Sequence, residues 1–106
     1  MTVVVRTIAL DASSWRTLDD LYNALFEATG ATLSHARNAN AFSEALIYAG
    51  DIELDPPYVI DIRNTRNLLP DAREELGHLR EAFRRYRADY REKFGHEADI
   101  NFLADP

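Results

Sequence analysis

Three short β-rich segments, separated by stretches long enough to form helices, restrict the fold of this chain more than any other feature. They span residues 3–10, 57–62 and 98–103, and β-branched or aromatic residues dominate each of them. Strands joined by such long connections pair in parallel, because the chain has to cross back over the sheet before the next strand begins. The sequence therefore predicts an α/β fold with a three-stranded parallel sheet, covered by three to four helices in a two-layer arrangement.

Both long connections carry signals for where helices begin and end. In the first, Thr17 can cap a helix over residues 18–29, and Gly30 can end it. Asn38 can cap a second helix by accepting a backbone N–H, and that helix is expected to run to Gly50. The first connection should therefore hold two short amphipathic helices.

The second connection predicts one long helix from Pro70 to Gly95, with Gly77 as a possible break. Its apolar residues recur at spacings of four and three: Ala72, Leu76, Leu79, Phe83, Tyr86 and Tyr90. This stripe either packs on the sheet or forms a coiled-coil seam between two copies of the chain. A chain of this length favours core packing in a monomer, and a homodimer through the long helix stays open as the alternative.

Composition excludes several kinds of chemistry and several partners. The chain has 106 residues, enough for one domain over residues 1–106, and it has no cysteine, so it has no disulfide, thiolate metal site or thiol nucleophile. Its formal charge of −6 disfavours binding to nucleic-acid phosphate and favours a basic partner. The first residues lack a secretory signal, and no apolar run is long enough to span a membrane, so a cytoplasmic protein is expected.

Candidate catalytic residues are few. Glu75 and His78 have the spacing of a metal-ligand pair on a helix, but such sites need a second copy of the pair, and this sequence has one. The sequence contains no glycine-rich phosphate loop and no nucleophile elbow. We therefore expect a protein that is not an enzyme and that uses neither a cofactor nor a metal.

The second helix is a better candidate for a functional surface. At 100° per residue, four of its side chains fall on one side, opposite the expected core stripe. These residues are Asn40, Ser43, Glu44 and Ile47. A polar strip with a carboxylate at its centre and an aliphatic neighbour is typical of a surface that binds another protein, and an ordinary solvated helix face with one isolated exposed Ile is the alternative.

Three segments carry a resemblance to a known family. They read SWRTLDDLYNAL at 14–25, NANAFSEAL at 38–46 and PYVIDI at 57–62, and they are similar to the barstar family of ribonuclease inhibitors. The likeness covers residues 3–64 and continues more weakly to Ile100. In that family, two Asp residues at the second helix enter the active site of a secreted ribonuclease, so the resemblance implies a helix that acts as a plug.

The resemblance carries over to this chain one residue at a time. Asn38 matches the family's Asn, Asn40 matches the first Asp, and Glu44 matches the second Asp. Glu92 resembles a third inhibitory acid on the last helix, a role that passes to Asp89 if the alignment contains a gap there.

The chain also departs from the family pattern. His35 and Ala36 replace a Tyr-Gly pair, and Arg37 places a cation beside the predicted face. The resemblance predicts a cytoplasmic inhibitor of a basic ribonuclease, that is, an immunity protein against a toxin, and a non-inhibitory interaction module of the same fold is the alternative. The predicted partner-binding residues are His35, Arg37, Asn38, Asn40, Ser43, Glu44, Ile47 and Glu92.

Overall fold

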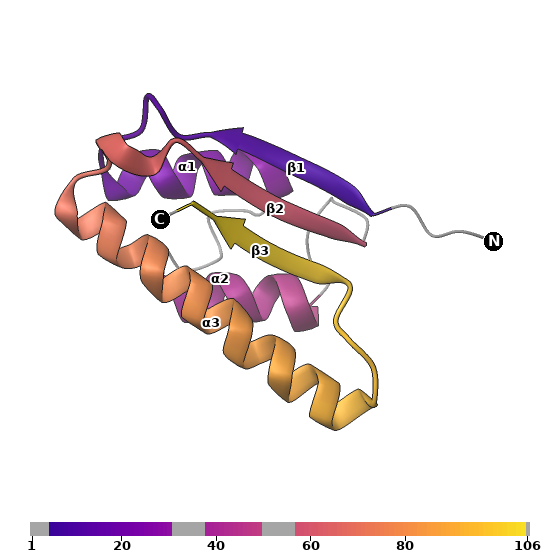
Figure 1. Ribbon diagram of the computed structural model, residues 1–106. Helices are drawn as coiled ribbons and strands as arrows, with labels where there is room; N and C mark the ends of the chain where they lie inside the picture. Colours follow the sequence, from indigo (N-terminus) through magenta and orange to yellow (C-terminus); the bar gives the residue numbers. More distant parts are fainter. Residues whose placement is uncertain (1–4, 31–37, 50–56, 106) are drawn as a thin grey trace.

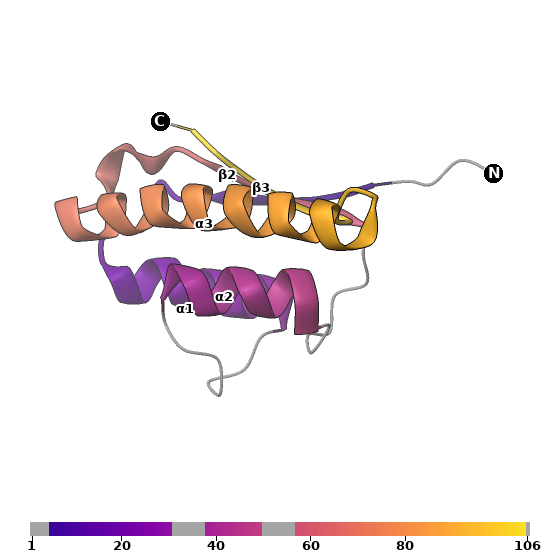
Figure 2. The same cartoon turned by 90° about the horizontal axis from the view of Figure 1, so that it is seen from below.

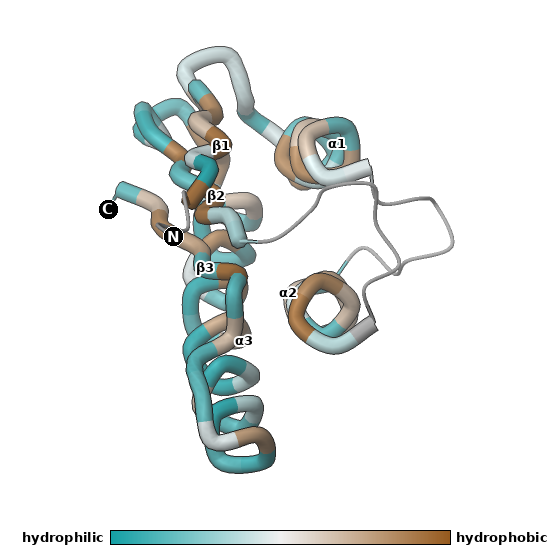
Figure 3. The backbone as a smooth tube through the Cα atoms, turned by 90° about the vertical axis from the view of Figure 1, so that its right-hand side faces the viewer, coloured by the Kyte–Doolittle hydropathy of each residue, from teal (hydrophilic) through white to brown (hydrophobic). Residues whose placement is uncertain are grey.

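The sheet and the helices form two layers. The computed structural model describes residues 5–30, 38–49 and 57–105. In Figures 1 and 3 the strands β1, β2 and β3 and the long helix α3 lie side by side, while α1 and α2 pack together on one face of that layer. The view along the layer in Figure 2 shows no helix on the other face of the sheet within the described residues. The predicted α/β fold is confirmed, but α3 lies beside β3 and flanks the sheet, whereas α1 and α2 cover its face.

The three strands form a parallel sheet in chain order. They are β1 (Arg6–Asp11), β2 (Tyr58–Arg63) and β3 (Ile100–Ala104). Ile8 is in register with Ile60, and Ile60 is in register with Phe102, so one row of apolar side chains runs across the inner face. The predicted parallel pairing is therefore confirmed, with strand bounds that differ from the expected ones by one to three residues.

The caps that the sequence suggested define two of the helices. α1 (Leu18–Thr29) begins with a capping box, in which Thr17 Oγ1 accepts from the N–H of Asp20 and the Asp20 carboxylate accepts from the N–H of Thr17. It ends at Gly30, whose φ of 75° is easiest for glycine. α3 (Pro70–Phe94) starts at Pro70 and runs through Gly77 without a break.

The second helix has two parts. α2 (Ala39–Glu44) is an α-helix, and it continues into a single π-helical segment, η1 (Ala45–Ala49). Asn38 caps α2 as predicted, because its side-chain oxygen accepts from the N–H of Ala41 at 2.8 Å.

The core between the layers is rich in aromatic rings. The ring of Phe42 on α2 meets those of Tyr22 and Phe26 on α1, and that of Phe83 on α3. Phe83 also stacks on Phe102 of β3, with centroids 4.9 Å apart. The stripe of α3 from Ala72 to Phe83 therefore packs inside the chain, which confirms the core interpretation for these residues and leaves Phe83 unavailable for a seam between two copies. Tyr86 and Tyr90 are half-buried against the edge of this core.

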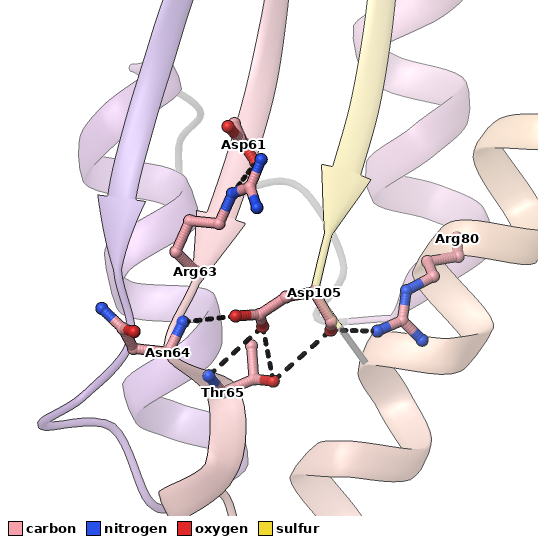
Figure 4. Close-up of polar contacts among 6 residues, drawn as sticks. All are labelled: Asp61, Arg63, Asn64, Thr65, Arg80 and Asp105. Atoms are coloured by element: carbon pink, nitrogen blue, oxygen red, sulfur yellow. Dashed lines mark hydrogen bonds and ion pairs between the residues drawn. The ribbon is translucent and has the colours of Figure 1, made fainter.

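A polar network joins the carboxyl ends of the strands to α3 (Figure 4). The Asp105 carboxylate accepts from the backbone N–H of Asn64 at 2.7 Å and from the Thr65 hydroxyl at 2.7 Å. Arg80 on α3 donates to the carbonyl oxygen of Asp105 at 2.6 Å. This network ties the end of β3 to the 3-10 turn η2 (Thr65–Asn67) and sets the position of α3 beside the sheet.

Within the described ranges, none of the helices combines the length and the apolar character needed to cross a bilayer.

Candidate partner-binding site

Two of the predicted side chains on α2 are exposed. Asn40 and Glu44 lie one helical turn apart on the solvent side, and both are exposed. Asn38 precedes them at the start of the helix, where its side chain is committed to the cap. The exposed side of α2 therefore presents the Asn40 amide and the Glu44 carboxylate, and the Asn38 cap fixes where the helix begins.

The prediction that Ser43 and Ile47 share this exposed edge is wrong. Ser43 has no exposed surface and Ile47 is 7% exposed. The buried residues of α2 and η1 recur mostly at helical spacings of three and four, and they are Ala39, Phe42, Ser43, Ala45, Leu46 and Ile47. More of the helix is buried than the sequence predicts, because α2 packs against α3 as well as contributing to the aromatic core.

Side chains from α3 hold both exposed residues of α2. The Arg85 guanidinium donates to Asn40 Oδ1 at 2.7 Å, and the Tyr86 hydroxyl donates to Glu44 Oε2 at 3.2 Å. Arg85 also lies over the Tyr86 ring, with its Cζ 5.3 Å from the centroid. These contacts restrict the rotamers of Asn40 and Glu44 before any partner arrives.

Three tyrosine rings pack together beside Glu44. The Tyr48 ring meets those of Tyr86 and Tyr90, and the Tyr48 hydroxyl donates to the carbonyl oxygen of Tyr86 at 3.4 Å. Burial raises the pKa of the Tyr48 hydroxyl above its usual value, and the negative charges of Asp89 and then Glu44 raise it further. Both carboxylates therefore act on the same hydroxyl, from α3 and from α2.

Of the two acids suggested for the last helix, Asp89 lies nearer to Tyr86 around α3 than Glu92 does, and the inhibitory role of either acid stays a prediction. At 100° per residue, Asp89 lies about 60° around α3 from Tyr86, whereas Glu92 lies about 120° away. Glu92 lines a groove between α3 and β3, together with Arg84 and Arg91. We use the name α2–α3 face for the surface formed by the exposed residues Asn40, Glu44, Arg85 and Asp89 together with the half-buried Tyr86.

A hollow of about 370 Å³ opens at one end of the α2–α3 face. Its lining includes Asn40 and Arg85 from the face and the acid Glu81 from the preceding turn of α3. Glu75, which also lines it, accepts from the Tyr22 hydroxyl at 2.5 Å and lies 3.3 Å from His78 Nδ1. Among the residues that the structure describes, no group of three or more His, Asp or Glu is placed to hold a metal ion.

Sequence reasoning missed Arg85 and placed Tyr86 only in the apolar stripe, which was expected either to pack on the sheet or to form a seam between two copies. Helical spacing places residues 85, 86 and 89 on one side of the predicted long helix. The sequence does not show that the second helix packs against that side. His35 and Arg37, two of the predicted partner-binding residues, lie outside the described residues. Their role stays a prediction.

Comparison with known proteins gives one finding that includes this whole site. A family model described as Barstar (barnase inhibitor) matches residues 5–102 of the chain. No curated protein matches the sequence. The matched range contains α1, α2 and α3, and therefore every residue of the α2–α3 face.

Proposed function

The chain belongs to the barstar family, and on that premise we propose that it inhibits a basic ribonuclease by covering the active site with its α2–α3 face. The observation that carries the proposal is the exposed Glu44 carboxylate, which Tyr86 holds on the solvent side of α2. The proposal involves no catalytic step by this chain. We also propose that the protein acts in the cytoplasm, where an inhibitor protects the cell from a toxic nuclease.

The chemistry of a ribonuclease site supports this role for Glu44. Such a site presents arginine, lysine and histidine to the phosphates of RNA, and a carboxylate makes charge-assisted hydrogen bonds with the same groups. Because the Tyr86 hydroxyl already orients Glu44, little side-chain entropy is lost when a partner binds. Asp89 on the neighbouring helix supplies a second negative charge close to the first.

Asn40 and Arg85 limit the range of targets. In the family, an Asp stands where this chain has Asn40, and here the Arg85 guanidinium occupies the amide oxygen at 2.7 Å. This end of the face is therefore less negative than the Glu44 end. We infer that the natural target presents its strongest cationic cluster to Glu44 and Asp89, and a hydrogen-bonding group to Asn40.

An inhibition assay tests the proposal. The protein is titrated into RNA cleavage reactions of several basic ribonucleases, one of which is barnase, the enzyme in the family's description. Stoichiometric inhibition of at least one enzyme is expected, and Glu44→Ala should weaken it by about 2–5 kcal/mol, a range that rests partly on complexes of this same family. Removal of Glu44 leaves cationic groups of the enzyme buried without a partner.

Glu74→Ala is the matched control for this assay. Its side chain is 74% exposed, the charge change is the same, and it lies about 18 Å along α3 from Tyr86. It should inhibit as well as the parent. If none of the enzymes is inhibited, or if the two variants lose affinity equally, the helix-plug assignment is wrong and the non-inhibitory interaction module becomes the better account.

A further inference from the structure

A groove of about 760 Å³ runs between α3 and β3, away from the α2–α3 face. Its α3 side is lined by Arg80, Arg84, Arg87 and Arg91. These residues follow one another at spacings of four, three and four, so they form a single stripe about 16 Å long on one flank of the helix. We call it the arginine stripe. Two acids, Glu92 and Glu97, also line the groove, so the groove is basic in a chain of charge −6.

Two members of the arginine stripe belong to the fold. The Arg87 guanidinium donates to the carbonyl oxygens of Ala98 and Ile100, and Arg80 donates to that of Asp105. Phe102 in β3 has its N–H bonded to the side chain of Asn101. These contacts occupy the outer edge of β3, so the groove is not arranged to accept an added strand.

The other two arginines are available to a partner. The side chains of Arg84 and Arg91 are 76% and 71% exposed, and their ion pairs with Glu81 and Glu97 are exposed as well. Exposed pairs of this kind contribute little to stability, so a partner's carboxylates can replace them at low cost. Arg84 and Arg91 are seven residues apart, which places them two turns apart on the same side of α3.

The floor of the groove is apolar. Phe83 and Phe102 form its base, and both are buried, while Leu103 of β3 is 47% exposed. The floor therefore offers an aliphatic contact but no exposed ring on which a nucleobase could stack. Together with the net charge of −6, this disfavours a single-stranded nucleic acid and favours a protein segment with few negative charges, each at a defined position.

We propose that this groove docks an acidic amphipathic helix of a partner protein. Two helices packed side by side have the same rise per residue, so carboxylates seven residues apart on the partner align with Arg84 and Arg91. An apolar residue between them on the partner covers Leu103. The proposal goes beyond the inhibitor function, because this groove lies on the other flank of α3 from Tyr86 and Asp89.

Two labelled peptides of about four turns provide the probe. They have the same composition; one repeats Glu at spacings of four, three and four beside leucines, and the other distributes the same residues around the helix. Fluorescence anisotropy should show at least tenfold tighter binding of the first peptide. The double variant Arg84→Gln/Arg91→Gln should lose that preference, whereas Arg66→Gln, an exposed arginine outside the groove, should keep it.

Leu103→Glu provides a second test, since it places a negative charge in the groove without touching the arginines. It should also weaken the first peptide at least tenfold, while inhibition of the ribonuclease stays unchanged in every variant. Equal binding of the two peptides, or an unchanged preference in the double arginine variant, would overturn the proposal. If the parent instead forms a dimer in sedimentation and the double variant does not, a second copy occupies the groove and the partner-helix proposal is wrong.

Discussion

Removing the Asp105 carboxylate should destabilise the protein, because this one group closes the polar network at the carboxyl ends of the strands (Figure 4). It accepts from both backbone N–H groups of Asn64 and Thr65 and from the Thr65 hydroxyl. Asn64 holds a left-handed backbone conformation there, with φ of 63°. The variants Asp105→Ala and Asp105→Asn separate the loss of the whole acceptor from the loss of its charge.

The burial of the donors sets the size of the effect. Thr65 is 4% exposed, so its bonds to a charged acceptor are hard to replace with water and contribute about 1.5 kcal/mol. Asn64 is exposed, water can take over its bond, and the expected loss there is about 0.5 kcal/mol. Asp105→Ala should therefore lower the free energy of unfolding by about 2 kcal/mol, and Asp105→Asn by about 1 kcal/mol because it keeps one acceptor oxygen.

The effect should depend on pH in a defined direction. The Thr65 hydroxyl, followed by the backbone N–H groups and Arg63, holds the pKa of Asp105 below its ordinary value of 3.8. A carboxyl with a lowered pKa in the folded state stabilises the protein above its unfolded pKa, and this stability is lost as the pH falls through the folded value. The gap in stability between the parent and Asp105→Asn should therefore be full at neutral pH and close progressively below about pH 4.

Urea unfolding at neutral pH and near pH 3 measures both the size and the pH dependence of this gap. Asp61→Asn is the control, since Asp61 pairs with Arg63, whose side chain is 63% exposed, and its replacement should cost less than about 1 kcal/mol. If Asp105→Asn is as stable as the parent at neutral pH, or if the gap between them is the same at both pH values, the reasoning about this network is refuted.

Two further predictions concern α2. Ser43→Ala should raise the free energy of unfolding by about 1 kcal/mol, because the buried Ser43 hydroxyl has no hydrogen-bond partner among the described residues. Inhibition should not change, and a loss of stability in urea unfolding would show that the hydroxyl is satisfied. Asn40→Asp should keep the fold, form an ion pair with Arg85, and bind the basic target more tightly as judged by calorimetry, most clearly when Arg85→Gln is added. Weaker binding in that double variant would show that the target is not basic at this end of the α2–α3 face.

Local signals determine most of the fold, whereas tertiary packing determines which side chains form the candidate site. Thr17, Asn38 and Pro70 mark helix starts through their own chemistry, and the lengths of the connections determine parallel pairing, so these features were predictable. Ser43 and Ile47 were misplaced because the sequence does not show that α2 packs against two neighbours. For the same reason, Asp89 could be separated from Glu92 only after the flank of α3 that meets Tyr48 was known.

Mapping where the ribonuclease binds tests directly whether the α2–α3 face is the inhibitory surface. The ¹⁵N-labelled protein is titrated with whichever enzyme of the assay it inhibits most tightly, and the backbone amide shifts are followed by NMR. If the α2–α3 face covers the enzyme, the largest changes fall at residues 40–44 and 85–89, with little change along β3. Large changes at β3 and the arginine stripe, with the α2–α3 face unaffected, would contradict this assignment.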